Sequence, residues 1–405
     1  MSISEQSMIA ILLCSHLGLG QNKDLKPFTL TEWNDVSDVL KKNNEAASLL
    51  FQKENTVLEQ GVFTKQKIDR IHSLLDRSGA AALEIEFWLQ RGIQIITIFD
   101  DNYPKLLKKR LQKKAPPVLF YAGDINLSNK IGISIVGSRN IDEAGMEFTK
   151  KLVSKAAKEN LVIYSGGARG VDSISEKAAL EEGSAVISFI ADSLASKIKK
   201  RDVIDAILGK RLLLLSDVKP DVGFSAARAM NRNKYVYAAS YGTFVVAADY
   251  KSGGTWSGAI ENIKYNWTKE FVWEQERYSG NKALISIGAN AFNLSDEKIY
   301  DLIMKKEESY KQLDFTAVFN SEESIAVRQD IKDESAAKNI EQGANSNDLY
   351  EVVREQILIN LGNGLSLEEA AEKFHIAKGQ MKTWLKRLCD EKAAHRSQNK
   401  YIKNT

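Results

Sequence analysis

Three glycine-containing turns carry residue types that bind phosphate, and each follows an apolar segment that we expect to be a β-strand. The turns are Gly137-Ser138-Arg139, Ser165-Gly166-Gly167-Ala168-Arg169-Gly170 and Lys251-Ser252-Gly253-Gly254-Thr255. Glycines let the backbone approach a ligand closely, and the N–H groups of a following helix attract anions. Arg139, Arg169 and Lys251 add positive charge. A glycine after a strand also makes an ordinary tight turn, but three turns of matching composition favour a phosphate-binding rim.

A second set of polar side chains lies on the segment Ser225–Ala239, which we predict to be a helix. The set is Arg228, Asn231, Arg232 and Tyr235, with Lys234 close by. Their spacing of three and four residues places the four on one helix face. The segment contains no acidic residue, so its arginines have no partner within the helix. This face is predicted to contribute to the phosphate site, and a solvated helix face is the alternative.

The sequence offers little for catalysis. It lacks the Gly-x-x-x-x-Gly-Lys-Ser/Thr loop, the Gly-x-Ser-x-Gly elbow, the His-Glu-x-x-His helix and any Cys-x-x-Cys pair. All four histidines lie outside the predicted α/β core: His16, His72, His375 and His395. Asp172 opens the helix after the second turn, where a carboxylate is expected to cap the helix rather than to act in catalysis. We therefore expect no enzymatic activity, no metal and no cofactor.

Apolar segments alternate with amphipathic ones through the middle of the chain. The predicted strands are Ile131–Val136, Leu161–Tyr164, Ala185–Ile190, Leu212–Ser216 and Thr243–Ala248. The predicted helices between them are Ile141–Glu159, Val171–Glu182, Lys197–Leu208 and Ser225–Ala239. This alternation is typical of a parallel sheet covered on both faces, an α/β, Rossmann-like architecture. Because the carboxyl ends of parallel strands meet at one edge, the three turns should converge there.

The flanking segments differ in pattern. Residues 1–91 are predicted to be a helical domain, with helices at 4–17, 31–51, 54–60 and 64–90 and an N-cap at Thr31. Residues 92–320 hold the α/β domain, and 321–347, which contain no aromatic residue, are predicted to be a linker. Residues 348–405 offer three helices and a hairpin, as in a winged helix. Eight basic and two acidic residues occupy positions 377–403, so this domain is expected to contact DNA or dock a protein.

Composition narrows the class of protein. The chain has 405 residues with 56 basic and 53 acidic side chains, a net charge of +3, which excludes a histone-like electrostatic binder. Cys14 and Cys389 stand at opposite ends of the sequence and form neither a disulfide framework nor a metal cluster, so a reducing, cytoplasmic location is expected. The apolar stretch Met8–Leu19 is too short to span a bilayer, and we expect no membrane association.

Taken in order, the motifs resemble those of the DprA/Smf family of DNA-processing proteins. They are Asp101-Asn102-Tyr103-Pro104-Lys105-Leu106-Leu107, Pro116-Pro117-Val118-Leu119-Phe120, Ile135-Val136 with the first turn, the second turn with Val171-Asp172, Ala178-Ala179-Leu180, Phe224, Asn231-Arg232, Ser252-Gly253-Gly254-Thr255, Gly280-Asn281, Leu284-Ile285 and Gly288-Ala289. The resemblance covers about Ile93 to Phe292. It implies a SAM-like N-terminal domain, a Rossmann-like centre and a winged-helix C-terminal domain.

The resemblance also implies a non-enzymatic function. Members of the family bind single-stranded DNA in a basic pocket, form homodimers and help to load a RecA-type recombinase during natural transformation. By carry-over, the DNA-binding positions are Gly137, Ser138, Arg139, Ser165, Gly166, Ala168, Arg169, Gly170, Asn231, Arg232, Ser252 and Gly253. Three departures mark a divergent member: Glu176 stands where the family usually has histidine, Met230 replaces an arginine, and 191–200 lack a Tyr-Pro turn.

The interpretation that we favour is a single-stranded DNA-binding protein whose phosphates are held by Arg139, Arg169, Arg232 and Lys251. Two alternatives remain. The pocket could serve a non-catalytic sensor of a free nucleotide that acts through a partner protein. Nucleotide hydrolysis is disfavoured, because the first glutamate after Gly253-Gly254-Thr255 is Glu261. The third possibility is a regulator that reads duplex DNA through the helix Ala377–Glu391.

Overall fold

The computed structural model describes residues 3–20, 24–42, 63–305, 354, 357–358, 361, 364–373, 378–391, 393–397 and 400–403. The chain forms two compact units, Met1–Leu313 and Asp314–Thr405. The predicted linker 321–347 and the predicted helix 54–60 lie outside the described residues. The finer domain limits at 91/92 and 347/348 stay predictions.

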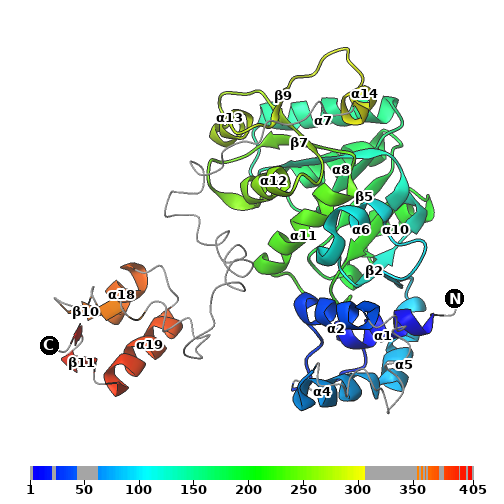
Figure 1. Ribbon diagram of the computed structural model, residues 1–405. Helices are drawn as coiled ribbons and strands as arrows, with labels where there is room; N and C mark the ends of the chain where they lie inside the picture. The colour runs from blue at the N-terminus through cyan, green and yellow to red at the C-terminus, as the bar shows by residue number, and fades with distance from the viewer. Residues whose placement is uncertain are drawn as a thin grey trace. The chain divides into compact units, whose positions relative to one another are not determined.

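The first unit is built around a nine-stranded sheet with the order β1-β2-β6-β5-β4-β3-β7-β8-β9 (Figure 1). The strands are β1 (Gln94–Thr97), β2 (Val118–Ala122), β3 (Gly132–Gly137), β4 (Val162–Ser165), β5 (Val186–Phe189), β6 (Leu212–Ser216), β7 (Gly242–Ala247), β8 (Lys269–Trp273) and β9 (Asn290–Phe292). The seven strands from β6 to β9 are parallel, which confirms the predicted α/β class. The sheet is not wholly parallel, because β2 pairs antiparallel with both β1 and β6.

Helices cover both faces of this sheet. They are α6 (Lys105–Leu111), α7 (Glu143–Lys158), α8 (Val171–Glu181), α9 (Leu194–Lys197), α10 (Arg201–Leu208), α11 (Ala226–Ala239), α12 (Gly253–Tyr265), α13 (Ser279–Ser286) and α14 (Ile299–Met304), with the 3-10 turns η2 (Gln112–Lys114) and η3 (Ile125–Asn129). Helices α7 and α8 pack against each other, and α11 packs against α6 and α12. Strands β4 to β6, β3 and β7 are buried along their lengths, which explains their almost continuous apolar sequences.

The direction of the chain reverses between β3 and β7. From β3 the strands are added toward β4, β5 and β6, whereas from β7 they are added toward β8 and β9. Because crossovers between parallel strands are right-handed, this reversal sends α7 and α8 to one face and α11 and α12 to the other. In open α/β sheets, ligands bind at such a point, beyond the carboxyl ends of the two central strands. The fold therefore places a crevice beside the turns that follow β3 and β7.

The N-terminal helices share one apolar core with the sheet. They are α1 (Glu5–Cys14), α2 (Leu30–Lys42), α4 (Lys65–Leu75) and α5 (Ser78–Leu89). Ile9, Leu12 and Trp88 belong to the same buried cluster as Val118 and Phe120 of β2. This continuity means that the helical segment stabilises the antiparallel edge of the sheet rather than standing apart from it.

Two details of the N-terminal helices differ from prediction. The N-cap of α2 is Thr29 and not Thr31: the Thr29 hydroxyl accepts from the Glu32 amide at 3.3 Å, and the Glu32 carboxylate accepts from the Thr29 amide at 2.8 Å. The predicted helix 64–90 breaks between α4 and α5, where the buried Arg77 guanidinium donates to backbone carbonyls, among them Ser15 at 2.9 Å. A buried guanidinium needs such acceptors, and the break brings them within its reach.

The second unit has a small apolar core of its own. Its described elements are β10 (Leu365–Ser366), α18 (Leu367–Lys373), α19 (Lys378–Asp390), β11 (Ala394–Ser397) and β12 (Lys400–Lys403), with strand order β10-β12-β11. Trp384, Leu385 and Leu388 of α19 pack with Ile357 and Leu361. The winged-helix assignment stays a prediction. Among the described residues of the chain, no helix is both long and apolar enough to cross a membrane.

Candidate nucleic-acid interface

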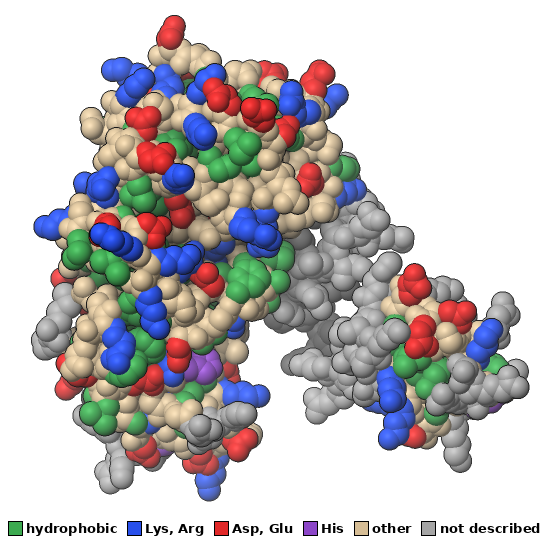
Figure 2. All heavy atoms as spheres, turned by 180° about the vertical axis from the view of Figure 1, so that it is seen from behind, with side chains coloured by type: hydrophobic (Ala, Val, Ile, Leu, Met, Phe, Trp, Pro, Cys, Tyr) green, Lys and Arg blue, Asp and Glu red, His purple; other side chains and the backbone are tan. Residues whose placement is uncertain are grey.

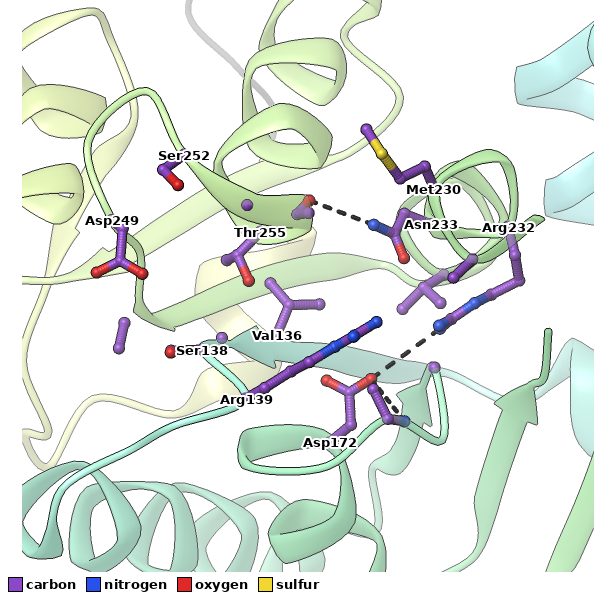
Figure 3. Close-up of a pocket in the computed structure, with 18 of the residues that line it drawn as sticks. Val136, Ser138, Arg139, Asp172, Met230, Arg232, Asn233, Asp249, Ser252 and Thr255 are labelled. Carbon is purple, nitrogen blue, oxygen red and sulfur yellow. Dashed lines mark hydrogen bonds and ion pairs between the residues drawn. The ribbon is translucent and has the colours of Figure 1, made fainter. Parts of the chain in front are cut away.

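The turns after β3, β4 and β7 line one pocket of about 410 Å³ at the point where the chain direction reverses (Figure 3). Helix α11 forms the remaining wall. The predicted site residues that line this main pocket are Gly137, Ser138, Arg139, Gly166, Ala168, Arg232, Ser252, Gly253, Gly254 and Thr255. Residues 114 positions apart in the sequence, from Arg139 to Gly253, thus meet because their strands end at the same sheet edge.

Arg232 of α11 reaches the main pocket from a buried position. Its side chain is 5% exposed, and Nη1 lies 4.0 Å from Oδ2 of Asp172, which is 8% exposed (Figure 3). The buried Nε of Arg232 finds no hydrogen-bond partner among the described residues. A buried guanidinium with one long ionic contact is under-satisfied, because each N–H taken out of water needs an acceptor. The pocket therefore offers a positive, hydrogen-bonding surface to an anion.

Asp172 does not cap its own helix as predicted. The residue before α8, Gly170, has no side-chain cap, and the Asp172 carboxylate instead accepts from the Ala168 amide of the preceding turn at 3.3 Å. Burial raises the pKa of Asp172 to about 6, the positive charge of Arg232 opposes that rise, and the nearby Glu176 adds to it. Asp172 thus holds the turn after β4 in place while balancing the charge of Arg232 only in part.

Two glycines of this turn are required by their surroundings. A Cβ atom on Gly166 would stand 1.4 Å from Nη1 of Arg232 and 2.7 Å from Oδ2 of Asp172. Gly170 has a φ of +78°, and a Cβ atom there would stand 2.3 Å from the Ser138 carbonyl oxygen. The glycines of the second turn therefore make room for the guanidinium and for the turn after β3.

The first turn of α12 points N–H groups toward the main pocket. The residue before the helix, Ser252, makes no side-chain cap, so the first amides of α12 keep no partner within the helix. Asn233 of α11 donates to the Gly254 carbonyl at 3.2 Å and joins the two helices. The buried Asn281 side chain accepts from the Ala248 amide at 2.8 Å and donates to the Val246 carbonyl at 2.9 Å, which fixes the end of β7.

A second pocket of about 280 Å³ adjoins the main pocket. It is lined by Arg139, Gly166, Gly167, Ala168, Arg169, Ala191, Asp192, Phe224 and Arg232. Four of these residues, among them Arg139 and Arg232, also line the main pocket, so the two form one continuous recess. Arg139 and Arg169 are exposed at its edge, and the Arg139 guanidinium lies 5.8 Å from the centre of the Phe224 ring.

The remaining predicted site residues lie outside both pockets. They are Ser165, Gly170, Arg228, Asn231, Lys234 and Lys251. Ser165 is fully buried at the end of β4, and Lys251 is exposed on the turn before α12. The structure thus brings the glycine turns and Arg232 together, and it leaves most of the polar face of α11 elsewhere.

The polar face of α11 has partners on other elements, contrary to the prediction that its arginines stand alone. The buried Tyr235 hydroxyl donates to Asp217 at 2.8 Å, and Asn231 reaches the same carboxylate at 3.4 Å. Arg228 donates to the Gly223 carbonyl, and Lys234 donates to the Asn231 side chain at 2.6 Å. Only Arg232 of the predicted set turns toward the main pocket.

Sequence reasoning missed several residues of the main pocket wall. They are Asn140, Ala226, Ala229, Asn233, Val236, Tyr237, Ala247 and Asp249, with Met230 noted only as a departure from the family pattern. Asn233 directly follows Arg232, and Asp249 follows β7, so both stood beside predicted residues. The apolar wall of α11 had no signal, because small apolar residues on a helix are typical of any core.

Charge is concentrated locally at the recess and not over whole faces. Figure 2, which shows the molecule from behind, has Lys and Arg side chains interspersed with Asp and Glu over the surface of the first unit. This mixture agrees with the net charge of +3. Recognition of an anion must therefore come from the recess itself rather than from the overall field of the protein.

Comparisons with known proteins identify relatives of this arrangement. The family model of DNA recombination-mediator protein A matches residues 94–303. The DNA processing protein DprA of Bacillus subtilis is 29% identical over 191 residues, which cover 47% of this chain and 62% of that protein. DprA of Streptococcus pneumoniae is 31% identical over 160 residues, which cover 39% of this chain and 55% of that protein. The chain thus matches little more than half the length of these relatives.

A solved structure shares the fold. The crystal structure of DNA processing protein A from Streptococcus pneumoniae aligns with a TM-score of 0.54 at 22% identity, covering 72% of this chain and 95% of that chain. The family match spans more than half of the 405 residues and includes all three glycine turns. These findings confirm the resemblance drawn from the motifs, and the chain belongs to the DNA recombination-mediator protein A family, that is, to DprA/Smf.

Proposed function

We propose that the chain binds single-stranded DNA by its sugar-phosphate backbone in the recess formed by the two pockets, and that it acts as a non-enzymatic mediator of recombination. The observation that carries the proposal is the buried Arg232, whose Nε has no partner among the described residues and whose guanidinium lines both pockets. A phosphate oxygen would supply the missing acceptor, and arginine suits phosphate because its N–H groups match two oxygens.

The depth of the recess favours a single strand over a duplex. Arg232 is only 5% exposed, so a phosphate reaches it only if the backbone that carries it enters the pocket. A single strand bends freely and can insert one phosphate, whereas a duplex presents its phosphates on a stiff, wide cylinder. The amides at the start of α12 and the exposed Arg139 and Arg169 would then hold the neighbouring phosphates.

The residues of the main pocket support binding rather than catalysis. Within the described chain, its lining holds no histidine, cysteine, lysine or glutamate. Asp172 is the lining residue with a pKa near the physiological range, about 6, and its carboxylate is already engaged by the Ala168 amide and Arg232. General acid–base catalysis needs a group free to reach the substrate, and Asp172 is held beneath the pocket floor.

Fluorescence anisotropy with a labelled oligo-dT at several salt concentrations tests this proposal. The double variant Arg139→Ala with Arg169→Ala should bind at least about tenfold more weakly, and its salt dependence should be shallower by roughly one to two phosphate contacts. The control Lys158→Ala with Lys177→Ala removes the same charge from exposed positions outside both pockets and should bind like the wild type. Equal affinity of the Arg139/Arg169 variant and the wild type would overturn the proposal.

The nucleotide-sensor alternative makes a different prediction in the same system. If a free nucleotide is the ligand, a mononucleotide should raise the thermal unfolding midpoint while oligonucleotides have no effect. We expect the reverse order, because an oligonucleotide places several phosphates in the recess and a mononucleotide places one.

Three further properties are proposed from family membership. The chain would form a homodimer, hand its bound strand to a RecA-type recombinase, and use the C-terminal unit as a winged helix for DNA or protein contact. On α19, Lys382 and Lys386 are exposed one turn apart, while Met381 and Leu385 are buried. Lys382→Glu with Lys386→Glu should weaken any DNA contact of this unit, whereas unchanged DNA affinity would assign the helix to a protein partner. Light scattering and a recombinase pull-down test the first two properties.

A further inference from the structure

The second pocket contains a carboxylate that phosphate binding does not use. Asp192 lies after β5 and lines this pocket together with Arg139, Arg169 and Phe224. Its side chain is 42% exposed, and Oδ2 lies 3.8 Å from Nζ of Lys197. A negative charge among arginines would repel a phosphate, so its presence in the lining needs another explanation.

The dimensions and lining of the second pocket fit a planar group. About 280 Å³ is less than the volume of a typical pocket for a drug-sized ligand and suits a single nucleobase. Phe224 is 58% exposed, which is unusual for a phenylalanine side chain, and so presents a ring face for stacking. The Arg139 guanidinium lies 5.8 Å from the centre of that ring, and a shift of this flexible side chain by about an ångström would let a base stack between them.

We propose, resting on the function proposed above, that the second pocket takes one base of the bound strand and that Asp192 selects guanine there. While one phosphate occupies Arg232, an adjoining base would enter the second pocket, because Arg139 and Arg232 line both. Phe224 would supply the stacking surface, and Asp192 would supply the acceptors for the edge of the base.

The chemistry of a carboxylate decides which base is preferred. An ionised carboxylate only accepts hydrogen bonds, and it has two oxygens with room for several donors. The contact with Lys197 involves Oδ2 at the long distance of 3.8 Å and leaves the other oxygen open to a ligand. Guanine presents its N1–H and N2 amino donors side by side and matches both oxygens, whereas thymine flanks its single N–H with two carbonyl oxygens that the carboxylate repels. Guanine is therefore expected to bind best and thymine worst.

Anisotropy with base-substituted oligonucleotides tests the inference on the full chain. The probes are labelled oligo-dT and the same oligonucleotide with every third thymine replaced by guanine or by hypoxanthine, which lacks the N2 amino group. The wild type should bind the guanine probe about tenfold more tightly than oligo-dT, with hypoxanthine between them. Asp192→Asn, which adds a donor and removes the charge, should abolish the preference.

The control is Asp221→Asn, which removes the same charge from an exposed position outside both pockets and should keep the guanine preference. Equal affinity of the wild type for all three probes, with steep salt dependence, would overturn the base assignment and leave the proposed function standing. A guanine preference that survives Asp192→Asn would overturn the role of Asp192. Absence of binding to every probe would instead overturn the proposed function.

Discussion

The Arg232 guanidinium and the Asp172 carboxylate lie 4.0 Å apart beneath the main pocket, and both are buried. A phosphate bound to Arg232 would bring a second negative charge toward Asp172 and favour its protonated form. Since the pKa of Asp172 is about 6 without ligand, phosphate binding should take up a proton. Affinity for oligo-dT should therefore rise as the pH falls toward about 6 and level off below it.

Anisotropy titrations between pH 5 and pH 8 at constant ionic strength measure this effect. Asp172→Asn keeps an oxygen that can accept from the Ala168 amide, and it should bind at all these pH values with the affinity that the wild type reaches at low pH. Asp205→Asn, an exposed carboxylate outside both pockets, should retain the wild-type pH profile. A profile that is the same in Asp172→Asn and the wild type would exclude proton uptake at Asp172.

Gly166→Ala should weaken DNA binding by displacing Arg232. The added Cβ would stand 1.4 Å from Nη1 of Arg232, so the guanidinium must leave its place beside Asp172. We expect a loss of affinity for oligo-dT of at least about tenfold, comparable to removal of a charged hydrogen-bonding group. Gly79→Ala, whose Cβ would meet nothing within 4 Å, is the matched control and should bind normally. Normal binding by Gly166→Ala would show that the position of Arg232 is irrelevant to DNA.

Glu270 should make the stability of the fold fall in alkaline solution. Its carboxyl group is buried in β8, Oε1 has no partner among the described residues, and burial raises its pKa to about 8 from an ordinary value of 4.5. The folded state thus holds a proton that the unfolded state releases between those two values, so stability falls as the pH rises through this window, and the loss is complete above about 8.

Glu270→Gln should flatten that dependence and unfold at a higher temperature than the wild type at pH 9, as measured by differential scanning calorimetry. The amide oxygen can still accept from Asn262, which donates to Glu270 Oε2 at 2.8 Å. Glu276→Gln, on an exposed position, should follow the wild type. If Glu270→Gln and the wild type lose stability equally between pH 6 and pH 9, Glu270 is not the group responsible.

Asn281→Ala should destabilise the protein and loosen the turn before α12. The buried side chain makes three hydrogen bonds to backbone groups, at Ala248, Val246 and Trp273. Leaving these groups unsatisfied should cost about 2–4 kcal/mol of unfolding free energy in urea titrations. Asn293→Ala removes an exposed side chain that bonds to Glu274 and should cost less than about 0.5 kcal/mol. Equal costs for the two variants would contradict the role of Asn281.

The sequence was sufficient to predict the parallel part of the sheet and its glycine turns. Long apolar strands and intervening helices have a strong local pattern, and the turns lie where each pattern ends. The antiparallel pairing of β2 with β6 could not be predicted, because Phe120 and Ser216 pair across about a hundred residues with no local signal. The break between α4 and α5 depends on the carbonyl groups around Arg77, which come from α1 and the loop after it.

The orientation of α11 was the main limit in predicting the site. Helical spacing placed Arg228, Asn231, Arg232 and Tyr235 on one face, but it could not show that Tyr235 would turn inward to Asp217 while Arg232 alone reached the main pocket. The pairing of Arg232 with Asp172, sixty residues away, is set by the order of strands in the sheet. Such contacts require the tertiary arrangement, whereas the glycine turns required only local pattern.

A crystal structure of the full chain with a short oligo-dT is the most direct measurement of where DNA binds. We expect a phosphate oxygen within hydrogen-bond distance of Nε or Nη1 of Arg232 and a neighbouring phosphate on the first amides of α12. Phosphates bound only outside the two pockets, with Arg232 still facing Asp172 alone, would contradict the assignment of the recess as the single-stranded DNA site.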